Sequence, residues 1–354
     1  MNFEREKCMN TEQLSERYED FWNCRNQTPV LLLKGQKKEI PQLQKVPSTQ
    51  KEKWTDIEYL IQKERAVLDS SFYLGDAFPL VNPNLGPDIF GASLGADLIF
   101  EETTSYSVPF VKDWTEDFTF HEENPWWQKI REITEAFTED SRGEYLVGIT
   151  DLHMGADGLV SIRGPENLCF DVIDQPEVFE NAKTVLLPAF QRQFEELYRI
   201  TQKYQVGTSN WMGLYKKEPW YVTSSDFICM VSQDTFRELI LPELREEIRY
   251  LKGNTIFHLD GPGALKHLDD LLAIPELAGI QWVYGAGQPS ARYWIEVLKK
   301  IQNAGKLINI GLQREDVEEI FTQLHPQGLS CYFDFEYTEK EAKEILEFAN
   351  RKCV

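Results

Sequence analysis

A histidine and an aspartate stand two residues apart at the end of an apolar run. The run begins at Thr255, contains His258 and Asp260, and breaks at Gly261-Pro262-Gly263. In a β-strand, residues i and i+2 point to the same face, so the imidazole and the carboxylate should emerge side by side where the strand ends. Such a pair can hold a metal ion or move a proton. The alternative is a buried pair that satisfies itself with one hydrogen bond.

Two further acidic positions are candidate site residues, and one of them follows a predicted strand. Asp151 and His153 come after the predicted strand 145–150 with the same i, i+2 spacing, which suits a second carboxylate–imidazole pair for proton transfer. A polar loop that satisfies its own backbone is the alternative. Asp226 lies ahead of a helix start near Ser232, where it either reaches the site or serves the loop and the helix cap. We take His258, Asp260, Asp226 and Asp151 as the candidate catalytic residues.

Four aromatic residues gather in the segment between the predicted strand 206–210 and Asp226. They are Trp211, Tyr215, Trp220 and Tyr221. They either pack this segment onto the rest of the fold or form an aromatic wall over a planar or cationic ligand. The sequence leaves both interpretations open.

Neighbouring residues at the end of another predicted strand supply one more contact. Gln281 and Trp282 end the strand 279–283, and because side chains alternate along a strand, one of them should face the site. Together with Trp211, Tyr215 and His153, they are candidate substrate-binding residues.

The periodicity of the chain predicts strands that alternate with helices, which indicates an α/β fold with a parallel sheet. About eight strands are expected, the number in a closed (β/α)8 TIM barrel. An open doubly wound sheet is the alternative, but no GxGxxG motif opens a helix. We expect one domain over residues 1–354, with an N-terminal helical extension over 1–28 and an inserted β-hairpin within 97–118. The predicted strands begin near residues 29, 77, 145, 206, 255, 279, 306 and 329.

Composition excludes several classes of protein. The net charge of −21 argues against nucleic acid as a partner, since phosphate binding needs a basic surface. Six cysteines without a CxxC pair indicate reduced thiols, and no apolar h-region follows Met1, so we expect a cytoplasmic protein. No apolar run approaches the ~18 residues that span a membrane.

Most of the chain resembles the uroporphyrinogen decarboxylase superfamily, which includes the zinc-dependent cobamide methyltransferases. The resemblance implies a (β/α)8 barrel whose active site lies at the carboxyl ends of the strands. Weaker matches are Pro29-Val30 and Leu94-Gly95-Ala96. The main motifs are Arg163-Gly-Pro-Glu-Asn167, Asp174-Gln-Pro-Glu177, Ser225-Asp226, Ser232-x-x-x-Phe236, Leu241-Pro242 and Phe257-His-x-Asp-Gly261.

Two departures from the decarboxylase pattern stand out. The arginine-rich segment that neutralises porphyrinogen carboxylates is replaced by the run Lys34–Lys38, which contains no arginine. The aspartate expected after the second strand is replaced by Asn82 or Asn84, and an asparagine cannot donate a proton as a carboxylic acid does. We therefore expect no porphyrinogen decarboxylation, and we expect Asn82 to contact a different substrate.

The methyltransferase branch of the superfamily binds zinc through a His-x-Cys pair and a later cysteine. The resemblance implies that His258 is the histidine, that Asp260 replaces the first cysteine, and that Cys331 is the second. Zinc accepts nitrogen, oxygen and sulfur ligands. Cys331 is alternatively a small core residue, and a shift of one position would turn it away from the site.

These observations predict a methyltransferase that moves a methyl group between a small methylated compound, a corrinoid protein and an acceptor. The corrinoid would arrive on a partner protein, because no Asp-x-His-x-x-Gly motif occurs here. A second copy of the chain, in a homodimer, is a further candidate partner. The alternatives are a decarboxylase or lyase for a smaller carboxylate, without a metal, and a catalytically silent ligand-binding barrel.

Overall fold

The computed structural model describes residues 11–352, so the first ten residues of the expected N-terminal extension lie outside the described part. The extension contributes one described helix, α1 (Thr11–Trp22). The described strands are β1 (Val30–Gln36), β2 (Ser71–Gly75), β3 (Leu80–Val81), β4 (Asp97–Phe100), β5 (Ser105–Val108), β6 (Leu146–Val147), β7 (Tyr221–Ser224), β8 (Thr255–Asp260), β9 (Gly279–Val283), β10 (Leu307–Leu312) and β11 (Leu329–Phe333).

Helices follow most of these strands, as the sequence predicts for an α/β fold. Beside α1 they are α2 (Gln50–Thr55), α3 (Ile57–Ser70), α4 (Ile89–Ser93), α5 (Pro125–Ser141), α6 (Gly155–Arg163), α7 (Pro165–Asp174), α8 (Glu177–Thr201), α9 (Gln233–Thr235), α10 (Leu241–Tyr250), α11 (Leu268–Leu272), α12 (Ile295–Asn303), α13 (Val317–Gln323) and α14 (Glu339–Lys352). Short 3₁₀ helices are η1 (Asp226–Met230), η3 (Pro262–His267), η4 (Ala291–Trp294) and η5 (Arg314–Asp316), and η2 (Phe236–Ile240) is a π-helix.

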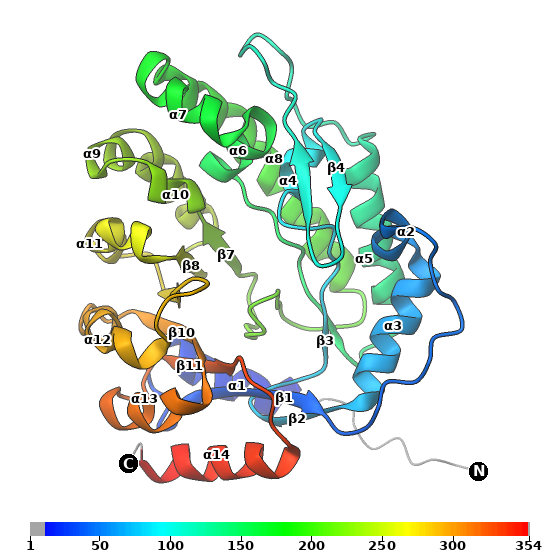
Figure 1. Ribbon diagram of the computed structural model, residues 1–354, viewed down its shortest axis with the longest axis vertical. Coiled ribbons are helices and arrows are strands. Elements are labelled where there is room, and N and C mark those ends of the chain that lie inside the picture. Colours follow the sequence, from blue (N-terminus) through cyan, green and yellow to red (C-terminus); the bar gives the residue numbers. More distant parts are fainter. Residues whose placement is uncertain (1–10, 353–354) are drawn as a thin grey trace.

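The central sheet has seven strands in the order β2-β1-β11-β10-β9-β8-β7. All neighbours from β1 to β7 in this order are parallel, and β2 joins the outer edge of β1 antiparallel. The helices lie on the outside of the strands (Figure 1). This is the arrangement expected when helical crossovers connect parallel strands.

The expected closed (β/α)8 barrel is not confirmed. β3 and β6 form a separate parallel pair, and within residues 11–352 no strand pairing joins β3 to β1 or β6 to β7. A side chain bridges the second gap: the hydroxyl of Tyr221 on β7 donates to the carbonyl of Thr150 (3.0 Å) and accepts from the backbone N–H of Leu152. The described fold is therefore a mixed, mostly parallel α/β fold with an open sheet.

One strand prediction was wrong in position. The predicted strand at 206–210 is reduced to isolated bridges, which join Ile149 to Asn210 and Thr208 to Lys216. The strand that pairs with β8 is β7, inside the segment where the sequence indicated only clustered aromatic residues. All four residues of β7 are buried. A strand buried on both faces lacks the polar–apolar alternation by which strands are recognised.

Beside the main hydrophobic core, a smaller hydrophobic cluster fills the amino ends of the strands. We call it the amino-end core. It takes the first residues of β1, β6 and β10, which are Val30, Leu146 and Leu307, and Tyr18 and Phe21 of α1 cover it. With this end of the sheet filled by apolar side chains, a site for a polar reaction belongs at the carboxyl ends. The full cluster is Tyr18, Phe21, Val30, Phe78, Leu146, Met212, Leu214, Tyr215, Trp220, Val222, Ile256 and Leu307.

An ion pair fastens α1 to the start of the sheet. Nε of Arg17 lies 2.7 Å from Oδ1 of Asp76, and Nη2 of Arg17 donates to the carbonyl of Pro29 (2.8 Å). The other carboxylate oxygen of Asp76 accepts from the backbone N–H of Leu31 on β1 (2.9 Å). Asp76 therefore connects the helix with the first strand.

The expected hairpin is confirmed, and a side chain caps the start of α5. β4 and β5 pair antiparallel within the predicted range 97–118. The side chain of Asn124 accepts from the backbone N–H groups of Trp126 and Trp127, with proline at the first helical position.

None of the helices within residues 11–352 has both the length and the apolar composition to cross a membrane.

Candidate functional site

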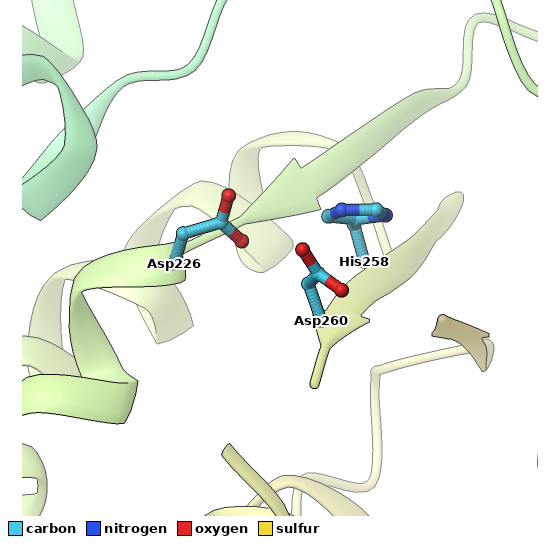
Figure 2. Close-up of side chains that lie close together, drawn as sticks. All are labelled: Asp226, His258 and Asp260. Carbon is cyan, nitrogen blue, oxygen red and sulfur yellow. The ribbon is translucent and has the colours of Figure 1, made fainter. Parts of the chain in front are cut away.

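Three side chains converge where β7 and β8 end. His258 and Asp260 lie on β8 with the predicted i, i+2 spacing, and Asp226 is the first residue of η1, separated from the end of β7 by Ser225. One ligand atom from each lies within 4.8 Å of the other two. Figure 2 shows the carboxylate of Asp226 turned toward Asp260 and His258. We call Asp226, His258 and Asp260 the carboxyl-end triad.

Asp226 is held in place by a second aspartate that the sequence analysis missed. Asp157, on α6, accepts from the backbone N–H of Asp226 (2.9 Å) and from that of Phe227 (3.0 Å). It also accepts from the hydroxyl of Ser224 (3.3 Å). Asp157 thus caps η1 from another helix. An acidic residue in the first turn of a helix is common for local reasons, so the sequence carries no sign of this distant role.

The surroundings of Asp226 shift its ionisation. Burial by neighbouring atoms and the negative charge of Asp157 raise its pKa, while His258 and His153 oppose the rise, and the resulting pKa is about 6. A carboxyl group with this pKa changes charge close to neutral pH. Asp226 can therefore exchange a proton under ordinary conditions.

His258 is oriented by its neighbour on the next strand. Nδ1 of His258 lies 2.5 Å from Oε1 of Gln281, its register partner on β9. The ring of Trp211 meets the imidazole edge-on, with ring centroids 5.3 Å apart. With Nδ1 engaged by Gln281, Nε2 is the ring nitrogen left for a ligand.

Asp260 shows the feature expected of a metal ligand. Its Oδ1 atom is buried and has no hydrogen-bond partner among residues 11–352. Leaving a buried carboxylate oxygen unpaired is unfavourable, and metal coordination removes the cost. Two carboxylates and one imidazole are a donor set that Zn²⁺ accepts. The residues present therefore fit a bound divalent metal.

Asp151 and His153 form the second predicted pair, close to the triad. Nε2 of His153 lies 2.7 Å from Oδ1 of Asp151. Burial alone would lower the pKa of His153, but the charge and contact of Asp151, helped by the charges of Asp157 and Asp226, raise the pKa to about 10. His153 is therefore a cation at neutral pH.

A cavity of about 380 Å³ is lined by two side chains that contact His258, while the triad residues themselves are not among its lining residues. Three of the predicted substrate contacts line it: Asn82, Trp211 and Gln281. Oδ1 of Asn82 is buried without a hydrogen-bond partner among the described residues. Because Trp211 and Gln281 also contact His258, the cavity and the triad share a wall. Further lining residues are Lys34, Phe78, Leu80, Tyr332 and Tyr337.

Beside His153, which pairs with Asp151 and does not line the cavity, two predicted substrate contacts are placed elsewhere. Tyr215 is 1% exposed in the amino-end core, where its ring packs on Tyr18 with centroids 5.9 Å apart. Trp282 is fully buried and packs on Trp294, because Gln281 takes the inward position and alternation turns Trp282 outward to the helices. Neither side chain forms part of the cavity wall.

Cys331 does not join His258 and Asp260, contrary to what the resemblance implies. It is fully buried in the main hydrophobic core, and the three-residue group contains Asp226 instead. The reason is register: Ser330 makes the side-chain contacts on the inner face of β11, so the next residue points to the other face. Cys331 therefore lies one residue away from the position on β11 whose side chain faces inward.

Comparisons with known proteins show a likeness at the level of the fold. No protein-family model matches the sequence, and no curated protein matches it either. Among solved structures, a methyltransferase from Methanosarcina mazei is similar, with a TM-score of 0.61 over 96% of this chain and 98% of that chain. The two sequences are 11% identical, so the likeness is one of fold alone.

Proposed function

We propose that this protein is a metal-dependent methyltransferase. It would move a methyl group between a small methylated compound, a corrinoid carried by a partner protein, and an acceptor. The observation that carries the proposal is the carboxyl-end triad, whose donor atoms lie within 4.8 Å of one another beside a cavity. The likeness in fold to a methyltransferase supports it. We interpret the open sheet and the β3–β6 pair as parts of one (β/α)8 barrel domain.

In this proposal the triad holds the metal and the cavity holds the organic substrate. Nε2 of His258 and the carboxylates of Asp226 and Asp260 are the ligands. A bound Zn²⁺ supplies Lewis acidity, which lowers the pKa of a nucleophile and favours its anion. Trp211 forms the wall between metal and substrate, and its ring limits access of water to the reacting atoms.

The methyl transfer balances without an added oxidant or reductant. With a thiol as acceptor, the sulfur loses its proton to solvent and attacks the methyl carbon. The new carbon–sulfur bond uses the sulfur electron pair, and the electron pair of the broken cobalt–carbon bond stays with cobalt.

One observation favours a second candidate, a lyase for a small carboxylate. A cationic His153 next to Asp151 is suited to protonate a carbanion. In such a decarboxylation the carbon–carbon bond breaks, CO₂ leaves, the electron pair remains on carbon, and the imidazolium supplies the proton. In a second assignment, His258 with Asp260 or Asp151 would serve as acid and base in place of His153, and no metal would be needed.

Elemental analysis with two histidine variants tests the proposal. We expect near-stoichiometric zinc in the purified protein, its loss in His258→Ala, and its retention in the exposed control His325→Ala. Methyl transfer from methylcobalamin to a small thiol, followed by cobalamin absorbance, should fail only in His258→Ala. Release of CO₂ from a small carboxylate by the chelated protein would instead indicate the lyase. Tight ligand binding without turnover would indicate the silent barrel.

A further inference from the structure

One level of the sheet interior is polar across four neighbouring strands. His258 on β8 is the register partner of Gln281 on β9, which pairs with Asn309 on β10, which pairs with Ser330 on β11. Gln281 is 2% exposed, and Asn309 and Ser330 are fully buried. Buried amides and hydroxyls are costly unless they are hydrogen-bonded. A row of three such side chains that leads from the core to the triad therefore requires a reason.

The direction of every hydrogen bond in this row follows from its far end. The Ser330 hydroxyl donates its one proton to the backbone carbonyl of Ile308 (2.9 Å), so its oxygen accepts from Nδ2 of Asn309 (3.0 Å). Oδ1 of Asn309 then accepts from Nε2 of Gln281 (2.8 Å). This leaves Oε1 of Gln281 facing Nδ1 of His258, and a carbonyl oxygen can only accept. His258 must donate.

We propose that Gln281, Asn309 and Ser330 are positioning residues that set the tautomer of His258. The row keeps the proton on Nδ1. The neutral ring then always offers the lone pair of Nε2 to a metal bound by the triad. A backbone carbonyl, which cannot reverse its role, is the fixed point of the row. The inference deepens the proposed function, because the value of a bare Nε2 rests on His258 being a metal ligand.

A buried glutamine elsewhere in the core provides a control for a purely structural role. Gln193 on α8 is also fully buried, and it donates to the hydroxyl of Ser93 (2.8 Å) without a histidine in reach. Its substitution removes a buried amide of the same kind from another part of the core. Gln193→Met is therefore the matched control for Gln281→Met: both variants lose core hydrogen bonds, and only the second touches His258.

Nitrogen NMR of the imidazole rings reads the tautomer directly. The sequence contains five histidines, so ¹⁵N-histidine labelling gives few signals, and His258→Ala assigns the one of interest. In zinc-free protein at alkaline pH, we expect His258 to be protonated at Nδ1 and bare at Nε2. Gln281→Met should populate the Nε2–H form, and Gln193→Met should leave the spectrum unchanged. A wild-type ring protonated at Nε2 overturns the proposal, even where the variant does not fold.

Zinc affinity, measured with Zn²⁺ against a competing chelator, provides the second readout. Gln281→Met should weaken binding about 10- to 100-fold, the usual effect of removing a partner of a metal-bound histidine. Gln281→Glu keeps an acceptor against Nδ1 and should restore wild-type or tighter binding. Equal affinities for Gln281→Met and wild type would contradict the proposal, as would equal losses in the methionine and glutamate variants.

The two proposals fail separately. If His258→Ala binds zinc as well as wild type does, the metal site of the proposed function is wrong, while the NMR result on the zinc-free protein still decides the tautomer. If the tautomer is the other one, the row is not what orients His258, whatever activity the protein has.

Discussion

The two ends of the parallel strands carry opposite kinds of side chain. At the amino ends, Val30, Leu146 and Leu307 begin their strands inside the amino-end core. At the carboxyl ends, β8 finishes in His258 and Asp260, and Oδ1 of Asp260 is buried without a hydrogen-bond partner among the described residues. These apolar residues at the first end stabilise the fold, and the second end holds polar atoms that destabilise it until a ligand arrives. Stability and chemistry are thus assigned to different ends of the same strands.

The largest effect is expected when a large side chain is removed from the amino-end core. Phe21 is fully buried, so Phe21→Ala should lower the free energy of unfolding by about 3–5 kcal/mol. Urea unfolding measures this change. Zinc affinity of the folded variant should equal that of wild type, since the triad lies at the other end. A drop in affinity would show that the two ends are coupled.

A conservative change in the triad should have the reverse signature. Asp260→Asn removes a charged ligand, and we expect zinc binding to weaken roughly 100-fold, which corresponds to about 2.7 kcal/mol. The metal-free variant should be at least as stable as wild type, because a neutral amide replaces the unpaired carboxylate. Chelator competition and urea unfolding measure the two quantities. Asp269→Asn, at an exposed position of α11, is the control.

The Asp151–His153 pair makes the carboxyl end sensitive to pH. The folded-state pKa of His153 is about 10, above the ordinary value of about 6.5, so the pair stabilises the fold fully below pH ~6.5 and loses this effect as the pH rises through ~10. Asp151→Asn should therefore destabilise the protein by roughly 1–3 kcal/mol at pH ~6, less than the full shift implies because both side chains are partly exposed.

Urea unfolding of wild type and Asp151→Asn at several pH values from ~6 to ~10 checks the sign. The gap between the two proteins should narrow steadily as the pH increases. A gap that widens would mean that His153 is neutral in the folded protein.

The smallest expected effect concerns Cys331. Since this side chain lies in the hydrophobic core rather than in the triad, Cys331→Ala should cost about 1 kcal/mol of stability and leave zinc affinity unchanged. The same unfolding and chelator measurements apply. Loss of zinc in this variant would restore the cysteine to the ligand set and displace Asp226 from it.

Local spacing explains which parts of the site were predictable. His258 and Asp260 lie two positions apart on one strand, and strand geometry alone brings them together. Gln281 and Trp282 show the limit, because alternation says that one faces inward without saying which. The direction of the Cys331 side chain was not predictable for the same reason, because a shift of one residue turns it to the other face. Asp157 was invisible, since it acts on η1 from a helix about 70 residues earlier in the chain.

The fold was predictable to a similar depth. Alternating strands and helices follow from periodicity. Five of the expected strands lie in the central sheet close to their predicted positions, as β1, β8, β9, β10 and β11, and two more form the separate β3–β6 pair. Closure was not predictable, because it depends on backbone pairing between β1 and β3 and between β6 and β7. At the second of these places the hydroxyl of Tyr221 occupies the gap. β7 itself was hidden because both of its faces are buried.

Asn26 joins the two ends of the chain, and this has a consequence for how the protein is made. Its side chain donates to the carbonyl of Pro326 (2.6 Å) and accepts from the backbone N–H of Gly328 (2.8 Å), across 300 residues of sequence, and β1 pairs with β11 beside it. During synthesis the first strand can pair early with β2, but it must wait for nearly the whole chain to leave the ribosome before β11 exists on its other side. Until then its apolar edge needs shielding, so a nascent chain that stalls before residue 329 should depend on chaperones.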